Sequence, residues 1–121
     1  MSKMHTIAPD IVRKRLMIEG YYTVEVDEAA IKGYFETITK ALGLTMYAKP
    51  MIYSPAGKGR QENQGYDAFV PLVDSGISLY VWTGSKFLSI LIYSCKEFDD
   101  ERAAEATKGY FKMTELETKS F

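Results

Sequence analysis

Few side chains in this sequence could carry out chemistry. The chain of 121 residues has one cysteine, Cys95, and one histidine, His5. A Ser-His or Cys-His nucleophile pair needs a histidine beside the reacting group, and His5 falls in a segment that we expect to be a loose N-terminal tail. Zinc needs several Cys, His or carboxylate ligands. The sequence therefore predicts neither an ordinary hydrolase nor a zinc site, and leaves metal binding only through carboxylates.

The remaining candidates are acidic, hydroxyl and aromatic side chains. They are Glu19, Asp67, Asp74, Ser75, Cys95 and the nine tyrosines. Each also has an ordinary structural interpretation. Asp74-Ser75-Gly76 makes a good turn, and a cysteine that ends an apolar strand suits a small buried position. Tyrosines and Trp82 commonly fill cores and interfaces. Spacing alone favours these structural interpretations.

A glycine-rich basic segment, Gly57-Lys58-Gly59-Arg60, offers a different chemistry. Glycines allow backbone amides to converge on an anion, and Lys58 and Arg60 add positive charge, so this loop can receive a carboxylate or a phosphate. Its spacing is not that of a P-loop. We expect a solvated loop over residues 56–65, mobile enough to act as a lid.

Composition excludes several classes of protein. Charged residues make up 26% of the chain and hydrophobic residues 46%, with fifteen basic side chains against sixteen acidic ones. These values are typical of a globular protein near neutrality. The one short basic run, Arg13, Lys14 and Arg15, does not predict nucleic-acid binding. No apolar stretch is long enough to span a membrane or to act as a signal region. We expect one cytoplasmic domain over residues 1–121, with 1–14 as a loose tail.

The elements that must position the candidate residues follow from hydrophobic spacing. Residues 15–26 alternate as a strand, and Asp27 can cap a helix that Gly43 ends. Residues 44–53 are rich in strand formers. An antiparallel meander is predicted over three apolar runs, 66–73, 77–83 and 87–93. Pro71 marks an edge strand or a bulge in this meander. Asp99 or Asp100 can cap a second helix through about Phe111, followed by a short strand.

This order, β-α-β-β-β-β-α-β, predicts an α+β fold. We expect a two-layer α/β sandwich, with a mainly antiparallel sheet and two helices on one face.

Residues 73–82, Val-Asp-Ser-Gly-Ile-Ser-Leu-Tyr-Val-Trp, followed by Tyr93-Ser94-Cys95, resemble the centre of the prokaryotic S-adenosylmethionine decarboxylase family. The family pattern there is an acidic residue, Ser, His, an apolar residue, Ser or Thr, an apolar residue, His, Thr and Trp, with a later Cys at the end of the next strand. The spacing from Ser75 to Cys95 matches without a gap. Ile18-Glu19-Gly20 is similar to the segment that supplies a substrate-contacting acid in the eukaryotic branch of the family.

The resemblance implies a specific chemistry for these positions. In that family the chain cuts itself before the serine, which becomes a pyruvoyl group that serves as the electron sink for decarboxylation. The cut would fall between Asp74 and Ser75, and Cys95 would return a proton to the substrate, while Trp82 is a structural match. Tyr80, however, replaces the processing histidine, and its ordinary pKa near 10 makes it a poor base at neutral pH.

Two further positions depart from the family pattern. Asp67 replaces a processing serine, and Trp82-Thr83-Gly84 replaces Trp-Pro-Glu. Three processing or site positions have therefore changed together.

These departures favour a lyase that acts on S-adenosylmethionine or a close derivative without a cofactor. The substrate carries its own leaving group, a sulfonium, and its own nucleophile, a carboxylate, so alignment alone can release methylthioadenosine and homoserine lactone. The faces of Tyr21, Tyr22, Tyr80 or Trp82 can attract the sulfonium by about 0.5 to 2 kcal/mol each. Asp67, Asp74 and Glu19 can add negative charge. If Lys58 and Arg60 bind phosphate, the substrate would be an adenylated or otherwise phosphorylated derivative.

Two alternatives stay open at the level of sequence. One is a genuine pyruvoyl-dependent decarboxylase of polyamine synthesis, which the presence of both Ser75 and Cys95 supports. The other is an inactive S-adenosylmethionine-binding sensor or partner subunit. In each case we expect a homo-oligomer with sites between protomers, and no membrane or nucleic-acid partner.

Overall fold

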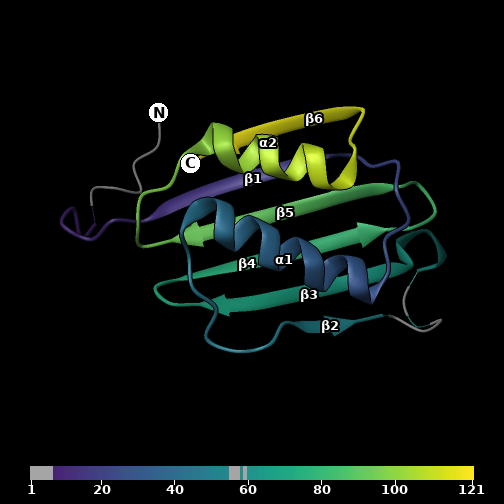
Figure 1. The fold of residues 1–121 in the computed structure, drawn as a ribbon, viewed down its shortest axis with the longest axis horizontal. Coiled ribbons are helices and arrows are strands. Elements are labelled where there is room, and N and C mark those ends of the chain that lie inside the picture. The colour runs from purple at the N-terminus through teal and green to yellow at the C-terminus, as the bar shows by residue number, and fades with distance from the viewer. Residues whose placement is uncertain (1–6, 55–57, 59) are drawn as a thin grey trace.

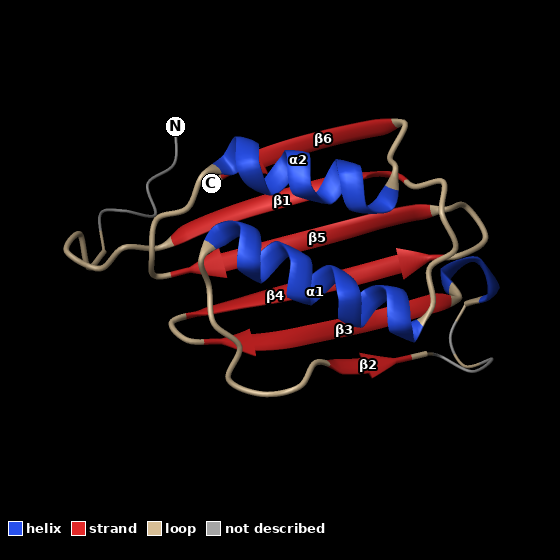
Figure 2. Ribbon diagram, in the orientation of Figure 1, coloured by secondary structure: helices blue, strands red, loops and turns tan. Residues whose placement is uncertain are grey.

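A computed structural model describes residues 7–54, 58 and 60–121, and in this part of the chain two helices cover one face of a six-stranded sheet (Figures 1 and 2). Every pairing is antiparallel, and the strands lie side by side in the order β2-β3-β4-β5-β1-β6. The predicted fold class and order of elements are confirmed. The elements are β1 (Lys14–Tyr21), α1 (Glu28–Leu42), β2 (Met51–Tyr53), the 3-10 turn η1 (Gln61–Asn63), β3 (Gly65–Leu72), β4 (Ser75–Trp82), β5 (Phe87–Ser94), α2 (Asp100–Phe111) and β6 (Glu115–Ser120).

The helix ends follow from local chemistry. The Asp27 side chain accepts a hydrogen bond from the Ala30 amide at 2.8 Å, and Gly43 has a φ of 69°, so α1 begins and ends as predicted. Asp99, rather than Asp100, caps α2 by accepting from the Glu101 amide at 2.9 Å. These caps satisfy backbone groups that the helices themselves leave without partners.

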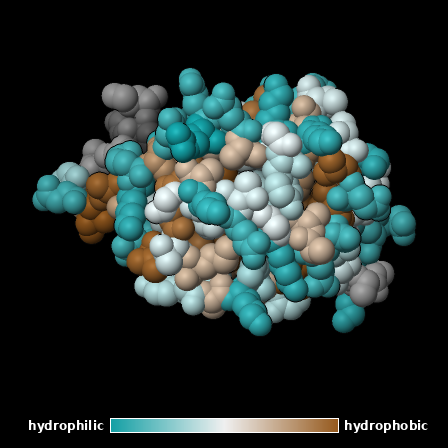
Figure 3. All heavy atoms as spheres, viewed as in Figure 1, coloured by the Kyte–Doolittle hydropathy of each residue, from teal (hydrophilic) through white to brown (hydrophobic). Residues whose placement is uncertain are grey.

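Two tyrosines join the helices into one layer. The hydroxyls of Tyr34 and Thr107 share a buried hydrogen bond of 2.8 Å, and the Tyr110 hydroxyl donates to the Ala30 carbonyl at 2.6 Å. The outer surface of this layer is mostly hydrophilic or neutral, with hydrophobic patches near its rim (Figure 3). None of the helices in the described residues is both long enough and apolar enough to cross a membrane.

Side chains alternate between the two faces of the sheet. In β4, Ile77, Leu79 and Val81 are buried beneath the helices, whereas Tyr80 on the opposite face is 43% exposed. We call the side away from the helices the open face. By alternation and register, the strand positions on it are Arg15, Met17, Glu19, Tyr21, Met51, Tyr53, Gly65, Asp67, Phe69, Pro71, Gly76, Ser78, Tyr80, Trp82, Phe87, Ser89, Leu91, Tyr93, Glu115, Glu117 and Lys119.

Two predicted strands are shorter than expected. β1 ends at Tyr21, because the next amides donate to Lys86 and Phe111 in other segments and the chain turns toward α1. In the segment predicted as a strand over 44–53, only an isolated bridge from Met46 to Leu72 precedes β2. Apolar composition in these connections reflects burial against the core rather than strand pairing.

The hairpin turn between β3 and β4 is Val73-Asp74, one step earlier than predicted. Ser75 and Gly76 are already paired in β4, and Asp74 has a φ of 59°, a conformation that aspartate tolerates better than most residues. Pro71 lies in β3 beyond Phe69, where the pairing with β2 ends. Because Pro71 lies outside the paired stretch, its lack of a backbone N–H removes no hydrogen bond between β3 and β2.

Two predicted loops are described only in part. Residues 7–13 precede β1 without joining the sheet, and the Arg13 guanidinium donates to the carbonyls of Ile7 and Ala8. Residues 1–6, with His5, lie outside the described residues. So do 55–57 and 59, of which 56, 57 and 59 belong to the loop predicted over 56–65. Within that loop η1 forms a single turn.

Candidate functional site

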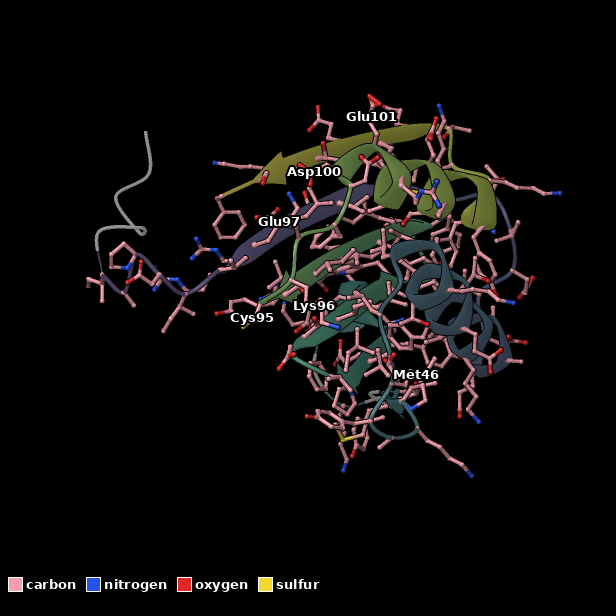
Figure 4. All side chains as sticks on the ribbon, turned by 60° about the vertical axis from the view of Figure 1, so that its left-hand side comes forward. Met46, Cys95, Lys96, Glu97, Asp100 and Glu101 are labelled. Carbon is pink, nitrogen blue, oxygen red and sulfur yellow. The ribbon has the colours of Figure 1, made fainter. Side chains whose placement is uncertain are left out.

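A pocket of about 350 Å³ opens on the open face beside the Val73-Asp74 turn. It brings together three predicted site residues, Asp74, Ser75 and Cys95, because Ser75 pairs with Ser94 and Cys95 follows directly. The Cys95 amide also donates to the Asp74 carbonyl at 2.8 Å. Figure 4 shows Cys95 just after β5, at the end of the sheet and away from α1. We call this the hairpin pocket, and its lining is Phe69, Asp74, Ser75, Gly76, Ser78, Leu91, Tyr93 and Cys95.

The Ser75 hydroxyl donates to a neutral acceptor. Its partner is the hydroxyl of Ser94 at 2.7 Å, and Ser94, which is fully buried, also accepts from the Lys96 amide at 2.9 Å. A serine becomes a strong nucleophile only when a neighbouring base takes its proton. The Ser94 hydroxyl is not such a base.

A wall of the hairpin pocket depends on a glycine. A Cβ atom at Gly76 would lie 3.0 Å from two ring atoms of Phe69. The aromatic ring therefore rests in the space that a larger residue would fill, and it forms part of an apolar lining shared with Leu91 and Tyr93.

A line of polar side chains crosses the open face, two residues from most of the strand ends that lie opposite the hairpin pocket. It contains one residue from each strand, paired in register, and we call it the polar row: Tyr53, Asp67, Tyr80, Ser89, Glu19 and Glu117. Neighbours in it lie about 5 Å apart, the spacing of adjacent strands. The Ser89 hydroxyl donates to the Glu19 carboxylate at 2.9 Å and so orients it.

Aromatic rings adjoin the polar row at the end of the sheet opposite the hairpin pocket. The Phe87 ring centroid lies 5.4 Å from that of Trp82 and 5.3 Å from that of Tyr21. A smaller pocket of about 190 Å³ there is lined by Tyr21 and Phe87 together with the acids Glu19, Glu115 and Glu117. Carboxylates beside aromatic faces form a surface that attracts cations.

The hairpin pocket and the polar row are separate within one chain. Tyr80 lies five residues after Ser75 on β4, which at about 3.3 Å per residue places their Cα atoms roughly 16 Å apart. Asp67 pairs with Tyr80 and lies equally far away. The two residues that replace the processing pair of the resemblance therefore do not reach Ser75 in the same protomer.

Three other predicted residues lie apart from both regions. Tyr22 is 4% exposed, its hydroxyl donates to the Trp82 carbonyl at 3.4 Å, and burial raises the pKa of its hydroxyl, so it belongs to the core. Arg60 forms an exposed ion pair of 2.7 Å with Glu62. The Gln64 amide group donates to the carbonyls of Lys58 and Arg60, in the loop beyond Tyr53.

Sequence reasoning missed several residues that shape this face. Strand alternation combined with the two hairpin turns could have placed Ser89 beside Tyr80, and Phe87 beside Trp82. No pattern in the sequence marks Ser94 as the partner of Ser75. Among the described residues, no group of three or more His, Cys, Asp or Glu side chains is arranged to hold a metal ion.

Comparison with known proteins adds a family assignment to this geometry. The crystal structure of the adenosylmethionine decarboxylase from Aquifex aeolicus VF5 is similar, with a TM-score of 0.70, 17% sequence identity, and coverage of 92% of this chain and 89% of that one. No curated protein matches the chain. The model of the family described as S-adenosylmethionine decarboxylase matches residues 14–121. The chain therefore belongs to the S-adenosylmethionine decarboxylase family.

Proposed function

We propose that the protein is a lyase that splits S-adenosylmethionine, or a close derivative, into methylthioadenosine and homoserine lactone without a pyruvoyl group. The observation that carries this proposal is the polar row with its neighbouring aromatic rings, an acidic and aromatic surface suited to a cationic ligand. Family membership supports a ligand of the S-adenosylmethionine class.

The proposed reaction needs neither a base nor an electron sink. One carboxylate oxygen of the substrate attacks the γ-carbon of its own methionine chain, and a carbon-oxygen bond forms as the carbon-sulfur bond breaks. The electron pair of that bond goes to the sulfur, which leaves as a neutral thioether. No proton moves, so the task of the protein is to bind and align.

The two regions of the open face suit different parts of this task. In the transition state a negative carboxylate and a positive sulfonium both lose charge, and an apolar surrounding such as the hairpin pocket favours that loss. Phe69, Leu91 and Tyr93 supply most of that surrounding. Glu19, which Ser89 orients, and Asp67 attract the cationic ligand, while Tyr21, Tyr80 and Trp82 offer it aromatic faces.

The residues present do not fit self-processing to a pyruvoyl group within one chain. Ser75 donates to Ser94, and Tyr80 and Asp67 are too distant to act on it. A pyruvoyl-dependent decarboxylase remains the second candidate, because Ser75 and Cys95 both border the hairpin pocket and Asp74 holds a left-handed backbone directly before Ser75. The Ser75 hydroxyl itself points to Ser94, on the covered side of the sheet. An inactive sensor is the third.

Homo-oligomerisation through the open face is part of the proposal. Large side chains there are exposed in the isolated chain, including Tyr53 at 66%, Met51 at 45% and Tyr93 at 40%. Exposed aromatic and apolar side chains on one face commonly mark an interface. A second copy laid on the open face would cover these residues and bring its polar row to the hairpin pocket.

Intact-mass measurement of the denatured protein, followed by incubation with S-adenosylmethionine, tests the proposal. We expect one uncut chain together with methylthioadenosine and homoserine lactone. Two fragments divided before Ser75, with a pyruvoyl mass and release of carbon dioxide, would establish the decarboxylase instead. An uncut chain that binds the compound without turnover would establish the sensor.

A pair of variants links the activity to the polar row. Glu19→Gln removes the charge that Ser89 orients, and we expect a loss of activity of at least tenfold. Glu105→Gln makes the same change on the exposed surface of α2 and should leave activity unchanged. Equal activity in both variants would show that Glu19, and with it the polar row, takes no part in the reaction.

A further inference from the structure

A separate cavity lies between α1 and the segment that joins α1 to β2. Its volume is about 410 Å³, and it shares no lining residue with the hairpin pocket or the polar row. Small-ligand sites commonly measure about 300 to 1,000 Å³, so this cavity falls near the lower end of their range. Figure 1 shows the segment passing the end of β3 on its way to β2. We call the cavity the helix-side pocket, and its lining includes Lys32 and Glu36 of α1 and Met46, Tyr47, Lys49 and Pro50 of the segment.

Hydrogen bonds to the end of β3 fix the backbone of this segment. The Tyr47 amide donates to the Pro71 carbonyl at 3.0 Å, and the Val73 amide donates to the Thr45 carbonyl at 2.8 Å. The residue between Thr45 and Tyr47 forms a bridge to Leu72. One wall of the helix-side pocket is therefore in place before a ligand arrives, which lowers the ordering cost of binding.

Tyr47 gives this wall an aromatic ring. The residue is 69% exposed, the largest exposed fraction of any aromatic residue that the structure describes. Met46 and Pro50 add apolar surface to the same pocket. An exposed ring on a fixed backbone, next to a thioether and a proline, is a platform on which a planar base can stack.

Two cations from different elements border the pocket. Lys32 lies on α1 and Lys49 on the segment before β2. Neither forms an ion pair within the part of the chain that the structure describes. A phosphate monoester carries a charge of about −1.5 to −2 near neutral pH, so two ammonium groups balance it. Lysine binds phosphate as a point charge on a flexible stem, which allows both side chains to meet one phosphate.

An acid distinguishes this pocket from a simple anion site. Glu36 lies four residues after Lys32, on the same face of α1, and lines the same pocket. Its carboxylate repels a free anion but accepts hydrogen bonds from hydroxyl groups, as acidic residues accept them from ribose in nucleotide sites. The helix-side pocket thus combines an aromatic platform, an acceptor for hydroxyls and a pair of cations.

We propose that the helix-side pocket binds a nucleoside monophosphate. The base stacks on Tyr47, the ribose hydroxyls donate to Glu36, and the phosphate lies between Lys32 and Lys49. The size of the cavity suits one nucleotide rather than a dinucleotide. Because the sheet separates this pocket from the open face, the inference goes beyond the proposed function and does not depend on it.

The test measures binding of adenosine monophosphate, adenosine and inorganic phosphate to the full chain by calorimetry. We expect adenosine monophosphate to bind more tightly than adenosine by about tenfold or more, since contacts to a charged phosphate are the strong ones. It should also bind more tightly than inorganic phosphate, which has no base to stack. Saturating S-adenosylmethionine should leave the affinity for adenosine monophosphate unchanged, because the two compounds occupy different places.

Variants separate the three contacts. The double variant Lys32→Met, Lys49→Met should remove most of the preference for adenosine monophosphate over adenosine. Tyr47→Ala should weaken binding of both compounds by at least about fivefold, whereas Tyr47→Phe keeps the ring and the affinity. Glu36→Ala should remove the preference for adenosine monophosphate over its dideoxy analogue. Lys108→Met changes an exposed lysine of α2 and is the matched control, with no expected effect.

The substituted side chains are exposed, so thermal unfolding without ligand should be the same in all variants. The site is established if the affinity for adenosine monophosphate falls in the double lysine variant and in Tyr47→Ala but not in Lys108→Met. The inference is wrong if adenosine monophosphate binds no more tightly than inorganic phosphate, or does not bind. It is also wrong if S-adenosylmethionine displaces adenosine monophosphate and the double lysine variant binds it normally, because the nucleotide then occupies the open face.

Discussion

The two faces of the sheet are built from the same strands but have different compositions. On the face beneath the helices, β4 and β5 present Ile77, Leu79, Leu88 and Ile90, all fully buried. On the open face, alternate positions of the same strands present tyrosines, serines and a tryptophan. The period of two in a strand thus separates the residues that hold the fold together from those available for binding.

This separation has an energetic consequence. Burying one aliphatic side chain contributes about 1.5 to 3 kcal/mol, so the covered face supplies most of the apolar burial that stabilises the chain. Open-face residues such as Tyr80 and Tyr93 remain more than a third exposed. Substitution there should therefore affect binding and assembly more than folding.

The largest expected contrast is between two neighbours on β5, Ile90 and Leu91. Ile90 is fully buried, and Ile90→Ala should lower the free energy of unfolding by about 2 to 5 kcal/mol. Leu91 lies on the open face, and Leu91→Ala should cost less than about 1 kcal/mol in the monomer. Urea denaturation measures both. Equal losses of unfolding free energy in the two variants at low protein concentration would contradict the contrast. If the loss caused by Leu91→Ala grows with protein concentration, a second copy covers this face.

A smaller effect is expected at the glycine beneath Phe69. Gly76→Ala places a Cβ atom 3.0 Å from the Phe69 ring, and moving the ring should cost about 1 to 3 kcal/mol of stability. The displaced ring should also weaken binding of S-adenosylmethionine at the hairpin pocket. Gly84→Ala is the control, because no atom lies within 4 Å of its added Cβ. Thermal unfolding and calorimetry measure the two effects, and identical behaviour of both variants would show that Phe69 does not depend on Gly76.

Some of this organisation could be predicted from sequence because its signals are local. Asp27 and Gly43 mark the ends of α1 through their own side chain or backbone, so both ends were predictable. Strand ends depend on partners distant in sequence. Residues 22–26 alternate like a strand, yet β1 stops at Tyr21 because the Tyr22 and Thr23 amides find acceptors in other segments.

The candidate site was predictable to a lesser extent. The resemblance named Ser75 and Cys95, and antiparallel pairing of β4 with β5 places both residues at the border of one pocket. Tyr22 and Tyr21 look equivalent in sequence, but only Tyr21 reaches the open face, because Tyr22 follows the end of the strand and packs near Phe111. The polar row could not be foreseen because it requires the register of all six strands.

The smallest expected contrast concerns two tyrosines on opposite sides of the sheet. Tyr34 is fully buried and shares a hydrogen bond with Thr107, so Tyr34→Phe should cost about 1 kcal/mol near neutral pH. Tyr80 is 43% exposed, and Tyr80→Phe should be within about 0.5 kcal/mol of the unaltered protein. Chemical denaturation at pH 7 measures the difference.

The buried Tyr34 should also affect stability in alkali. Burial raises the pKa of the Tyr34 hydroxyl, an effect that the Thr107 hydrogen bond only partly opposes. In the unfolded chain the pKa returns to about 10, so the folded state keeps a proton that the unfolded state releases, and stability falls as pH rises above that value. Tyr34→Phe should reduce this fall. Because burial also raises the pKa of Tyr22 and Tyr110, part of the fall should persist in Tyr34→Phe. Unfolding free energies measured from pH 8 to 11 with an unchanged slope in Tyr34→Phe would show that the Tyr34 hydroxyl is not held protonated by the covered face.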